Sequence, residues 1–363
     1  MSRGENVRFG TREDRLTRPP RRNAAIRSES SEFITRPDPS FAMRAVRFHD
    51  HGGRDVLQVD DIDTPEPAAG EVLVEVAAAG VNPVDTYFRE GSYQPFAMPM
   101  IPGVDVAGTV AAVGADVTGF AEGDHVVGTG IGKDHYGGYA EFAAVPTDRL
   151  AVLSDDVDLV AAGGAGVAGV TAWRALVDHG GMQLGDTVLI HGGSGGVGHA
   201  AVQLAAASGA RVIATAAPDY HDRVAELGAD VVLDYDRDDL ADAVVDTATG
   251  DGVDLTLDHR LDDYLQFDAD VAAHGGRVVG IGENDPEVGF DLSSSARGKD
   301  LSLTMMSMFN TPDLSAPLRE LAGQMGAGEF EIDVARTYDL DEAAEAHRAV
   351  MEDSFLGKLV ITP

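Results

Sequence analysis

Three glycines at fixed spacing are the residues of this chain with the clearest chemical use. Gly193, Gly195 and Gly198 fit the pattern G-x-G-x-x-G directly after the apolar run 187–190. Glycine there lets a strand turn sharply, lets the backbone approach a diphosphate, and lets the next helix pack tightly on its strand. The start of that helix would offer unpaired backbone N–H groups to an anion. The spacing therefore predicts a site for the diphosphate of a dinucleotide.

The segments around these glycines favour the same interpretation. Gly185-Asp186 leads into a strand at Thr187–Ile190, and Val197–Ala207 is predicted to be a helix that ends at Gly209. Further strands are predicted at Arg211–Ala216, Asp230–Leu233, Asp254–Asp258 and Arg277–Ile281. Strands that alternate with helices predict a doubly wound parallel sheet with helices on both faces. We assign this nucleotide-binding domain to residues 169–305.

The preceding part of the chain, residues 43–168, has a different pattern. Short β-runs such as Glu71–Ala77, Val104–Val113 and His125–Gly128 are broken by Gly and Pro, which predicts a compact barrel-like domain. Residues 306–363 are expected to return to this domain. Their predicted elements are helices at Leu314–Met325 and Asp341–Met351 and a terminal strand at Lys358–Thr362.

Charge is the most unusual property of the composition. The 363 residues include 61 acidic and 27 basic side chains, for a net charge of −34. Such a surface disfavours binding to nucleic acid. Lysine is so scarce (Lys133, Lys299 and Lys358) that we expect a protein of a salt-rich cytoplasm, where salt screens the self-repulsion. An ordinary acidic protein is the alternative.

The first 42 residues differ from the rest, with nine arginines, six acidic residues and no periodicity. They are expected to be a disordered extension, with a functional basic arm as the alternative. Met43 looks like the start of the folded part. The longest uncharged stretch, Leu159–Trp173, is too short and too weakly apolar for a membrane span, and no secretory signal is visible. A cytoplasmic protein is expected.

Several ordered motifs carry a resemblance to a known family. The chain resembles the zinc-independent quinone oxidoreductase (ζ-crystallin-like) branch of the medium-chain dehydrogenase/reductase superfamily. Besides the glycine turn, the matching segments are Ala79–Tyr87, Pro102–Gly108, Gly123–Gly128, Gly137–Phe142, Gly275–Gly280 and Gly357-Lys358. The resemblance implies an α/β architecture, with a GroES-like β-barrel catalytic domain and a Rossmann nucleotide-binding domain. It also implies a homodimer formed through edge strands.

The metal ligands of the family's zinc enzymes are missing from this chain. It has no cysteine, so disulfides and every Cys-ligated zinc site are excluded. Asn82 stands where those enzymes carry a Cys, and Val104-Asp105 where they carry His-Glu. An enzyme without that metal cannot polarise an alcohol or carbonyl through a Lewis acid, so its acceptor must itself stabilise negative charge.

We therefore predict an NADPH-dependent oxidoreductase that transfers a hydride to a quinone or an activated alkene such as an enone. Two alternatives stay open: an enoyl-thioester reductase, and a crystallin-like binding or structural protein. NADPH is preferred, with NADH possible, because the second strand ends in Ala214–Pro218 without the acid that would hold a ribose 2′-hydroxyl.

The resemblance also implies roles for individual residues. Asn82 and Tyr87 are the predicted catalytic residues, and Tyr87 would donate a hydrogen bond or a proton to the acceptor. The cofactor-binding residues are expected to be Thr171, Gly193, Ser194, Gly195, Gly196, Val197, Gly198, Ala217, His221, Arg223, Tyr235, Val279, Gly280, Ile281, Gly282, Met306 and Lys358. Five of these assignments have plain alternatives. Tyr87 could be a wall of the cleft, Thr171 a helix cap, Tyr235 an ordinary strand residue, Met306 part of core packing or of an interface, and Lys358 a solvated lysine.

Overall fold

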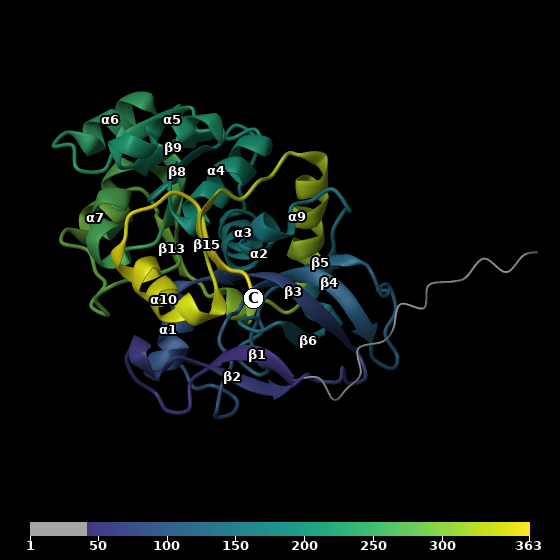
Figure 1. Cartoon of the computed structure of the whole chain (residues 1–363). Helices are drawn as coiled ribbons and strands as arrows, with labels where there is room; N and C mark the ends of the chain where they lie inside the picture. The colour runs from purple at the N-terminus through teal and green to yellow at the C-terminus, as the bar shows by residue number, and fades with distance from the viewer. Residues whose placement is uncertain (1–41) are drawn as a thin grey trace, which may run out of the picture. The chain divides into compact units, whose positions relative to one another are not determined.

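The computed structural model describes residues 42–363, so the predicted disorder of the N-terminal extension concerns residues outside the described part. The strands of the described part form a two-stranded, a six-stranded and a seven-stranded sheet (Figure 1). The two-stranded sheet pairs β1 (Ala42–Arg47) with β2 (Gln58–Asp63). The two larger sheets carry the candidate site.

The six-stranded sheet is parallel throughout and has the order β10-β9-β8-β11-β12-β13. Its strands are β8 (Thr187–Ile190), β9 (Arg211–Ala216), β10 (Val231–Asp234), β11 (Val253–Asp258), β12 (Ala272–Gly280) and β13 (Ser302–Met305). The direction of strand succession reverses between β8 and β11. Ligands of such sheets bind beyond the carboxyl ends of the strands at this switch point.

Helices cover both faces of this sheet. Val188 and Ile190 of β8 belong to the apolar core that contains α3 (Ala165–Trp173) and α4 (Gly196–Ala207), whereas Leu189 belongs to the core that contains α6 (Leu240–Thr247). Successive strand residues face opposite sides, so a strand buried on both sides is apolar throughout. The remaining helical segments here are η3 (Arg174–His179), η4 (Pro218–Tyr220), α5 (His221–Glu226), α7 (Leu261–Val271) and α8 (Ser293–Gly298).

The seven-stranded sheet combines strands from both ends of the described chain, because β15 runs antiparallel beside β3 with Leu359 opposite Val81. The order is β14-β15-β3-β4-β5-β7, with β6 also paired to β3, and the pairings within residues 42–363 do not join β7 back to β14. The strands are β3 (Glu71–Val81), β4 (Val106–Val113), β5 (His125–Gly128), β6 (Phe142–Pro146), β7 (Leu150–Val152), β14 (Val334–Tyr338) and β15 (Lys358–Ile361). Its helical segments are η1 (Arg54–Val56), α1 (Pro83–Glu90), η2 (Thr147–Arg149), α2 (Leu159–Gly163), η5 (Met308–Asn310), α9 (Ser315–Ala327), η6 (Leu340–Glu342) and α10 (Ala343–Glu352).

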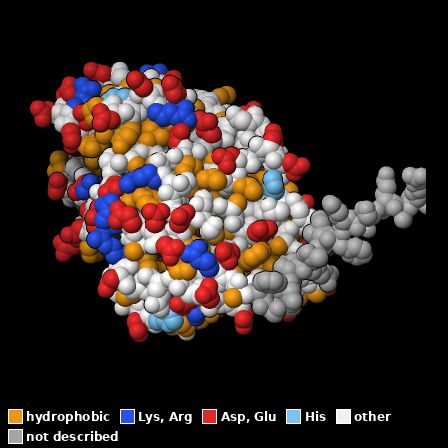
Figure 2. All heavy atoms as spheres, in the orientation of Figure 1, with side chains coloured by type: hydrophobic (Ala, Val, Ile, Leu, Met, Phe, Trp, Pro, Cys, Tyr) orange, Lys and Arg blue, Asp and Glu red, His pale blue; other side chains and the backbone are white. Residues whose placement is uncertain are grey.

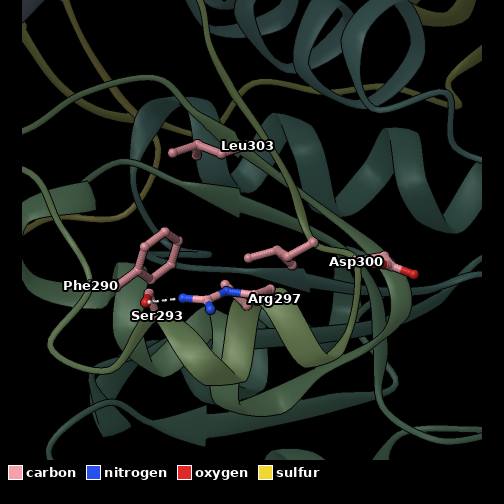
Figure 3. A pocket seen from close by; sticks show the side chains of 7 residues that line it. Phe290, Ser293, Arg297, Asp300 and Leu303 are labelled. Carbon is pink, nitrogen blue, oxygen red and sulfur yellow. Dashed lines mark hydrogen bonds between the residues drawn. The ribbon is translucent and has the colours of Figure 1, made fainter.

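The predicted fold class, a GroES-like part with a Rossmann sheet, is confirmed. The domain limits stay predictions, and α3 runs across the one proposed between residues 168 and 169. Strand β13 was not predicted, because Ser302 and Leu303 are exposed at the sheet edge and give no apolar run. Beside β13 lies a hollow of about 420 Å³, where Arg297 donates to Ser293 next to Phe290 (Figure 3).

Acidic side chains are spread over the face seen in Figure 2, with fewer basic ones between them. Within residues 42–363, no helix is both long and apolar enough to cross a membrane. The homodimer expected to form through edge strands stays a prediction.

Candidate active site

The glycine turn joins the end of β8 to the start of α4. The N–H of Gly193 donates to the carbonyl of Thr215 in β9 at 2.7 Å, and the N–H of Gly192 donates to its Oγ1 at 3.1 Å. These two bonds hold the turn against the neighbouring strand. The N–H of Gly195 donates to the carbonyl of Gly192 at 2.9 Å, which closes the turn before the helix begins.

The space around each glycine shows why no larger residue serves there. A Cβ on Gly193 would lie 2.9 Å from the Cβ of Ala214, and a Cβ on Gly198 would lie 2.0 Å from the carbonyl oxygen of Gly192. Gly193 is thus required by packing on β9, and Gly198 by packing on the turn itself. Within 4 Å of a Cβ on Gly195, the atom met is the carbonyl oxygen of Gly192, at 3.3 Å. The open side therefore lies at the glycine that lets a diphosphate approach the backbone.

The turn fits a dinucleotide diphosphate for a second reason. Helix α4 is twelve residues long and starts with Gly195 as its N-cap, and the cap makes no side-chain hydrogen bond. The first N–H groups of a helix lack internal partners and carry a partial positive charge. Residues 193–198 can thus hold the diphosphate of a nicotinamide dinucleotide through backbone groups alone.

The last strand of the chain reaches this turn. The N–H of Gly357 donates to the carbonyl of Ser194 at 2.8 Å, and a Cβ on Gly196 would lie 2.9 Å from Cδ of Lys358. Lys358 is only 4% exposed, so the alternative of a solvated lysine is wrong. Its Nζ donates to the carbonyl of Val81 at 2.9 Å and to Oδ1 of Asn82.

A buried polar network continues from Lys358 through Asn82. The amide Nδ2 of Asn82 donates to Oδ2 of Asp105 at 2.9 Å. The other carboxylate oxygen of Asp105 accepts from Oγ1 of Thr129 at 2.6 Å and from the N–H of Val167 at 2.8 Å. Asn82 is 2% exposed and its amide is occupied at both ends, so in this arrangement it positions its neighbours. Its predicted catalytic role stays untested.

Asp85 fixes the start of α1 beside this network. Its carboxylate accepts from the N–H of Asn82 at 2.9 Å and from the N–H of Val104 at 3.0 Å. Burial raises the pKa of Asp85 to about 7, and the nearby charge of Asp105 adds to the effect. Burial also raises the pKa of Asp105 and lowers that of Lys358, while attraction between these two groups opposes both shifts.

Tyr87 lies two residues further along α1 than Asp85 and is half-buried. Burial raises the pKa of Tyr87, and Tyr93, Glu90 and Glu283 add to the shift. The phenol therefore keeps its proton at neutral pH and can donate a hydrogen bond. Glu283 directly follows the predicted nicotinamide-side residues Val279–Gly282 (Gly280 and Ile281 among them).

The end of β12 is held tightly where the nicotinamide is predicted to lie. The N–H of Ile281 donates to the carbonyl of Asp258 at 2.8 Å, and the N–H of Met306 donates to that of Gly280 at 3.0 Å. A Cβ on Gly280 would lie 2.1 Å from Cδ1 of Leu261, so packing requires this glycine. Thr171 is buried near the end of α3, which begins at Ala165, so the helix-cap alternative is wrong.

The residues predicted at the adenosine end have different surroundings. Ala217 follows β9, and Nε2 of His221 lies 3.0 Å from the carbonyl of Ala216. Tyr235 lies just past β10 and is 43% exposed. The guanidinium of Arg223 is already engaged by Asp333, at 3.0 Å, and by Glu331. These carboxylates raise the pKa of Arg223 further and compete with any 2′-phosphate.

A second buried cluster was not predicted from the sequence. His191, the first residue of the turn, places Nε2 2.9 Å from Oδ1 of Asp268 and stacks on Tyr264 with ring centroids 4.3 Å apart. Burial lowers the pKa of His191 to about 4. Burial likewise raises the pKa of Asp268 to about 8 and that of its neighbour Asp258. The residues of this cluster are spread over positions 191–268 of the sequence, so no local sequence pattern predicted it.

The fold and the turn together define a dinucleotide-dependent oxidoreductase of the medium-chain type. Residues 68–155 match the alcohol dehydrogenase GroES-like domain, and residues 227–361 match the family described as zinc-binding dehydrogenase. The human quinone oxidoreductase is 32% identical over 327 residues, which cover 88% of this chain and 97% of that protein.

Solved structures agree with these matches. A quinone oxidoreductase from Coxiella burnetii is 30% identical with a TM-score of 0.76, covering 89% of this chain and 99% of that one. A protein described as NAD-dependent alcohol dehydrogenase is 31% identical with a TM-score of 0.81, covering 88% and 100%. The chain belongs to the zinc-independent branch of the quinone oxidoreductase family. Within residues 42–363, no three His, Asp or Glu side chains are grouped to hold a metal ion.

The buried cluster predicts a pH-dependent stability. Folded Asp268 keeps its proton up to about pH 8, whereas the unfolded carboxyl loses it near 3.8. The stabilisation is therefore present at low pH and is lost as the pH rises through about 8. Titration of His191 makes stability rise with pH instead, but only below 6.5, the pKa of the unfolded side chain. We expect urea unfolding to show stability falling between pH 6.5 and 8, and Asp268→Asn to reduce that fall by about 1 kcal/mol. Asp270→Asn, exposed on the same helix, should keep the wild-type slope; equal slopes in all three proteins would contradict the assignment.

The network around Asn82 predicts coupling between two charges. Lys358→Met should lower the free energy of unfolding by about 3 kcal/mol, because it leaves buried Asp105 without a compensating cation. Lys299→Met is the control, since within residues 42–363 the Nζ of Lys299 donates to the carbonyl of Asp270 near the surface. In Lys358→Met/Asp105→Asn both charges are gone, so denaturant titration should show a loss at least about 1 kcal/mol smaller than the sum of the single losses. Additive losses would mean that the two groups do not interact.

Proposed function

We propose that this protein transfers a hydride from NADPH to a quinone or another conjugated acceptor without the help of a metal. The observation that carries the proposal is the bare turn 193–198. Of the three spaced glycines, Gly193 and Gly198 are closely packed. The open space lies at Gly195, in front of the N-terminus of α4. When bound, the reduced nicotinamide supplies the hydride, and the protein supplies placement and electrostatics.

The residue types around Asn82 support a metal-free reaction. Where the zinc relatives place ligands, this chain has the amide of Asn82 between Lys358 and Asp105, all three buried. An amide hydrogen-bonded at both ends and a lysine ammonium are poor ligands for zinc. Negative charge developing on the acceptor must then be delocalised by the acceptor itself, as quinones and enones do.

The chain's own residues would act in a simple order. The turn 193–198 holds the diphosphate, and the small residues Gly280 and Gly282 let the nicotinamide lie against the end of β12. The phenol of Tyr87 is protonated at neutral pH, as that of an ordinary tyrosine is, and burial raises its pKa further. It can donate a hydrogen bond to the acceptor oxygen, where the added electron pair comes to rest, and supply a proton to it.

NADPH is proposed over NADH because the backbone after β9 carries no acid before Asp219. A carboxylate at the end of that strand would repel a 2′-phosphate. His221 and Tyr235 remain the candidates to approach the phosphate. Arg223 could do so only by leaving Asp333, to which Nε donates at 3.0 Å.

Turnover measurements test this proposal. NADPH or NADH oxidation would be followed by absorbance with 1,4-naphthoquinone, a simple enone and an enoyl thioester, in concentrated potassium chloride with and without a chelator. We expect the quinone or enone to be reduced, kcat/KM to be several-fold higher with NADPH, and the chelator to have no effect. Turnover of the thioester alone, or loss of activity with chelator, would contradict the proposal.

A further inference from the structure

An aromatic cluster lies beside the predicted hydride-transfer position. It consists of Tyr87 and Phe88 of α1, Tyr93 after that helix, and Phe309 of η5. The Tyr93 ring lies 6.0 Å from that of Tyr87 and 5.6 Å from that of Phe88, and Phe88 meets Phe309 edge-to-face at 6.2 Å. Phe88 is buried, Tyr93 is 50% exposed, and Tyr87 and Phe309 are half-buried. The outer members therefore offer ring surface that the fold does not use.

This cluster is attached to the nicotinamide side of the site. Segment 306–309 is fixed to the end of β12, because Met306 donates to the carbonyl of Gly280, and to η3, because Arg174 donates to that of Ser307. Helix α1 is held at its other end by Asp85 and Asn82, which belong to the buried network of Lys358. Both walls of the cluster are thus anchored to the elements that would position the cofactor.

The two ends of the cluster differ in charge. The Tyr87 end lies near the carboxylates of Glu90 and Glu283. At the Phe309 end, Nζ of Lys133 lies 5.3 Å from the centroid of the Phe309 ring. Lys133 is exposed and has no carboxylate within 4 Å among residues 42–363. The adjacent Asp134 is already bound by Arg149 through both oxygens, at 2.5 and 2.7 Å.

An unpaired lysine is unusual in a chain with 61 acidic residues and three lysines. Lys358 is buried, and Lys299 donates to a backbone carbonyl. Lys133 instead lies over an aromatic ring with its ammonium free for an anion. A planar acceptor lying along the cluster would meet negative charge near Tyr87 and positive charge near Phe309, so its own charge would decide its orientation.

We propose that the aromatic cluster and Lys133 form the acceptor-binding surface, and that it selects a planar conjugated acceptor with an anionic substituent such as a carboxylate or sulfonate. The rings of Tyr93 and Phe309 contact the acceptor plane, Lys133 pairs with its anionic group, and its reducible oxygen lies toward Tyr87. This inference rests on the proposed function, because it names the acceptor of the same hydride transfer.

The test compares 1,4-naphthoquinone-2-sulfonate with neutral 1,4-naphthoquinone in wild type, Lys133→Met and Lys299→Met. We expect Lys133→Met to raise KM for the sulfonate about fivefold and to leave KM for the neutral quinone within about twofold. Added salt should shrink the difference, because it screens an exposed ion pair. Lys299→Met removes the same charge away from the cluster and should match wild type with both acceptors.

A second variant tests the aromatic contact. Phe309→Leu should raise KM for both quinones several-fold, because it removes ring surface while keeping apolar volume. Equal KM changes for the two quinones in Lys133→Met, or none for either, would overturn this inference while leaving the proposed function standing. A wild-type enzyme that reduces neither quinone would overturn this inference, and one that also fails to reduce the simple enone would overturn the proposed function as well.

Discussion

The N–H of Gly357 donates to the carbonyl of Ser194, and this bond ties the last strand to the turn that would receive the diphosphate. Gly357 has a φ of 83°, and a Cβ there would lie 2.0 Å from the carbonyl oxygen of Asp333, so only glycine fits. Lys358 follows Gly357 directly. Its side chain passes beside Gly196 in the first turn of α4, and its Nζ donates to Oδ1 of Asn82. These hydrogen bonds connect the cofactor turn, the C-terminal strand and helix α1 into one unit. We therefore expect a displacement of one of them to displace the other two.

Electrostatics within this unit bear on the kind of acceptor that we propose. Burial penalises the charges of Lys358, Asp105 and Asp85, and their hydrogen bonds and the attraction of Lys358 to the two carboxylates offset part of that penalty. The amide of Asn82 lies between the lysine and Asp105, and both its ends are occupied. The ammonium of Lys358 is thus buried, and it donates its hydrogen bonds to Val81 and Asn82 of the protein itself. It is not available to polarise a substrate carbonyl, so an acceptor that delocalises charge by itself suits the site.

The sequence predicted correctly those strands whose residue pattern and flanking turn residues lie close together in the chain. Strands β8 and β9 have the predicted ends, because each is an apolar run between turn residues. Strand β13 was missed because an exposed edge shows no apolar run, and the helix-cap alternative for Thr171 is wrong because α3 begins six residues earlier, at Ala165. The burial of Lys358 and the pairing of Arg223 with Asp333 join residues that are far apart in the chain. No local spacing encodes such contacts, so only the folded structure could reveal them.

Calorimetric titration of NADPH into wild type and Gly195→Val tests most directly whether the backbone turn holds the coenzyme. Gly195 has a φ of −72°, which valine adopts without strain, and its Cβ direction is open except for one oxygen. The variant should therefore fold with an unchanged unfolding midpoint while its side chain fills the space for the diphosphate. The account predicts one NADPH per wild-type chain and at least about hundredfold weaker binding, about 2.7 kcal/mol, in the variant. Equal affinity in the two proteins, or no binding to wild type, would contradict it.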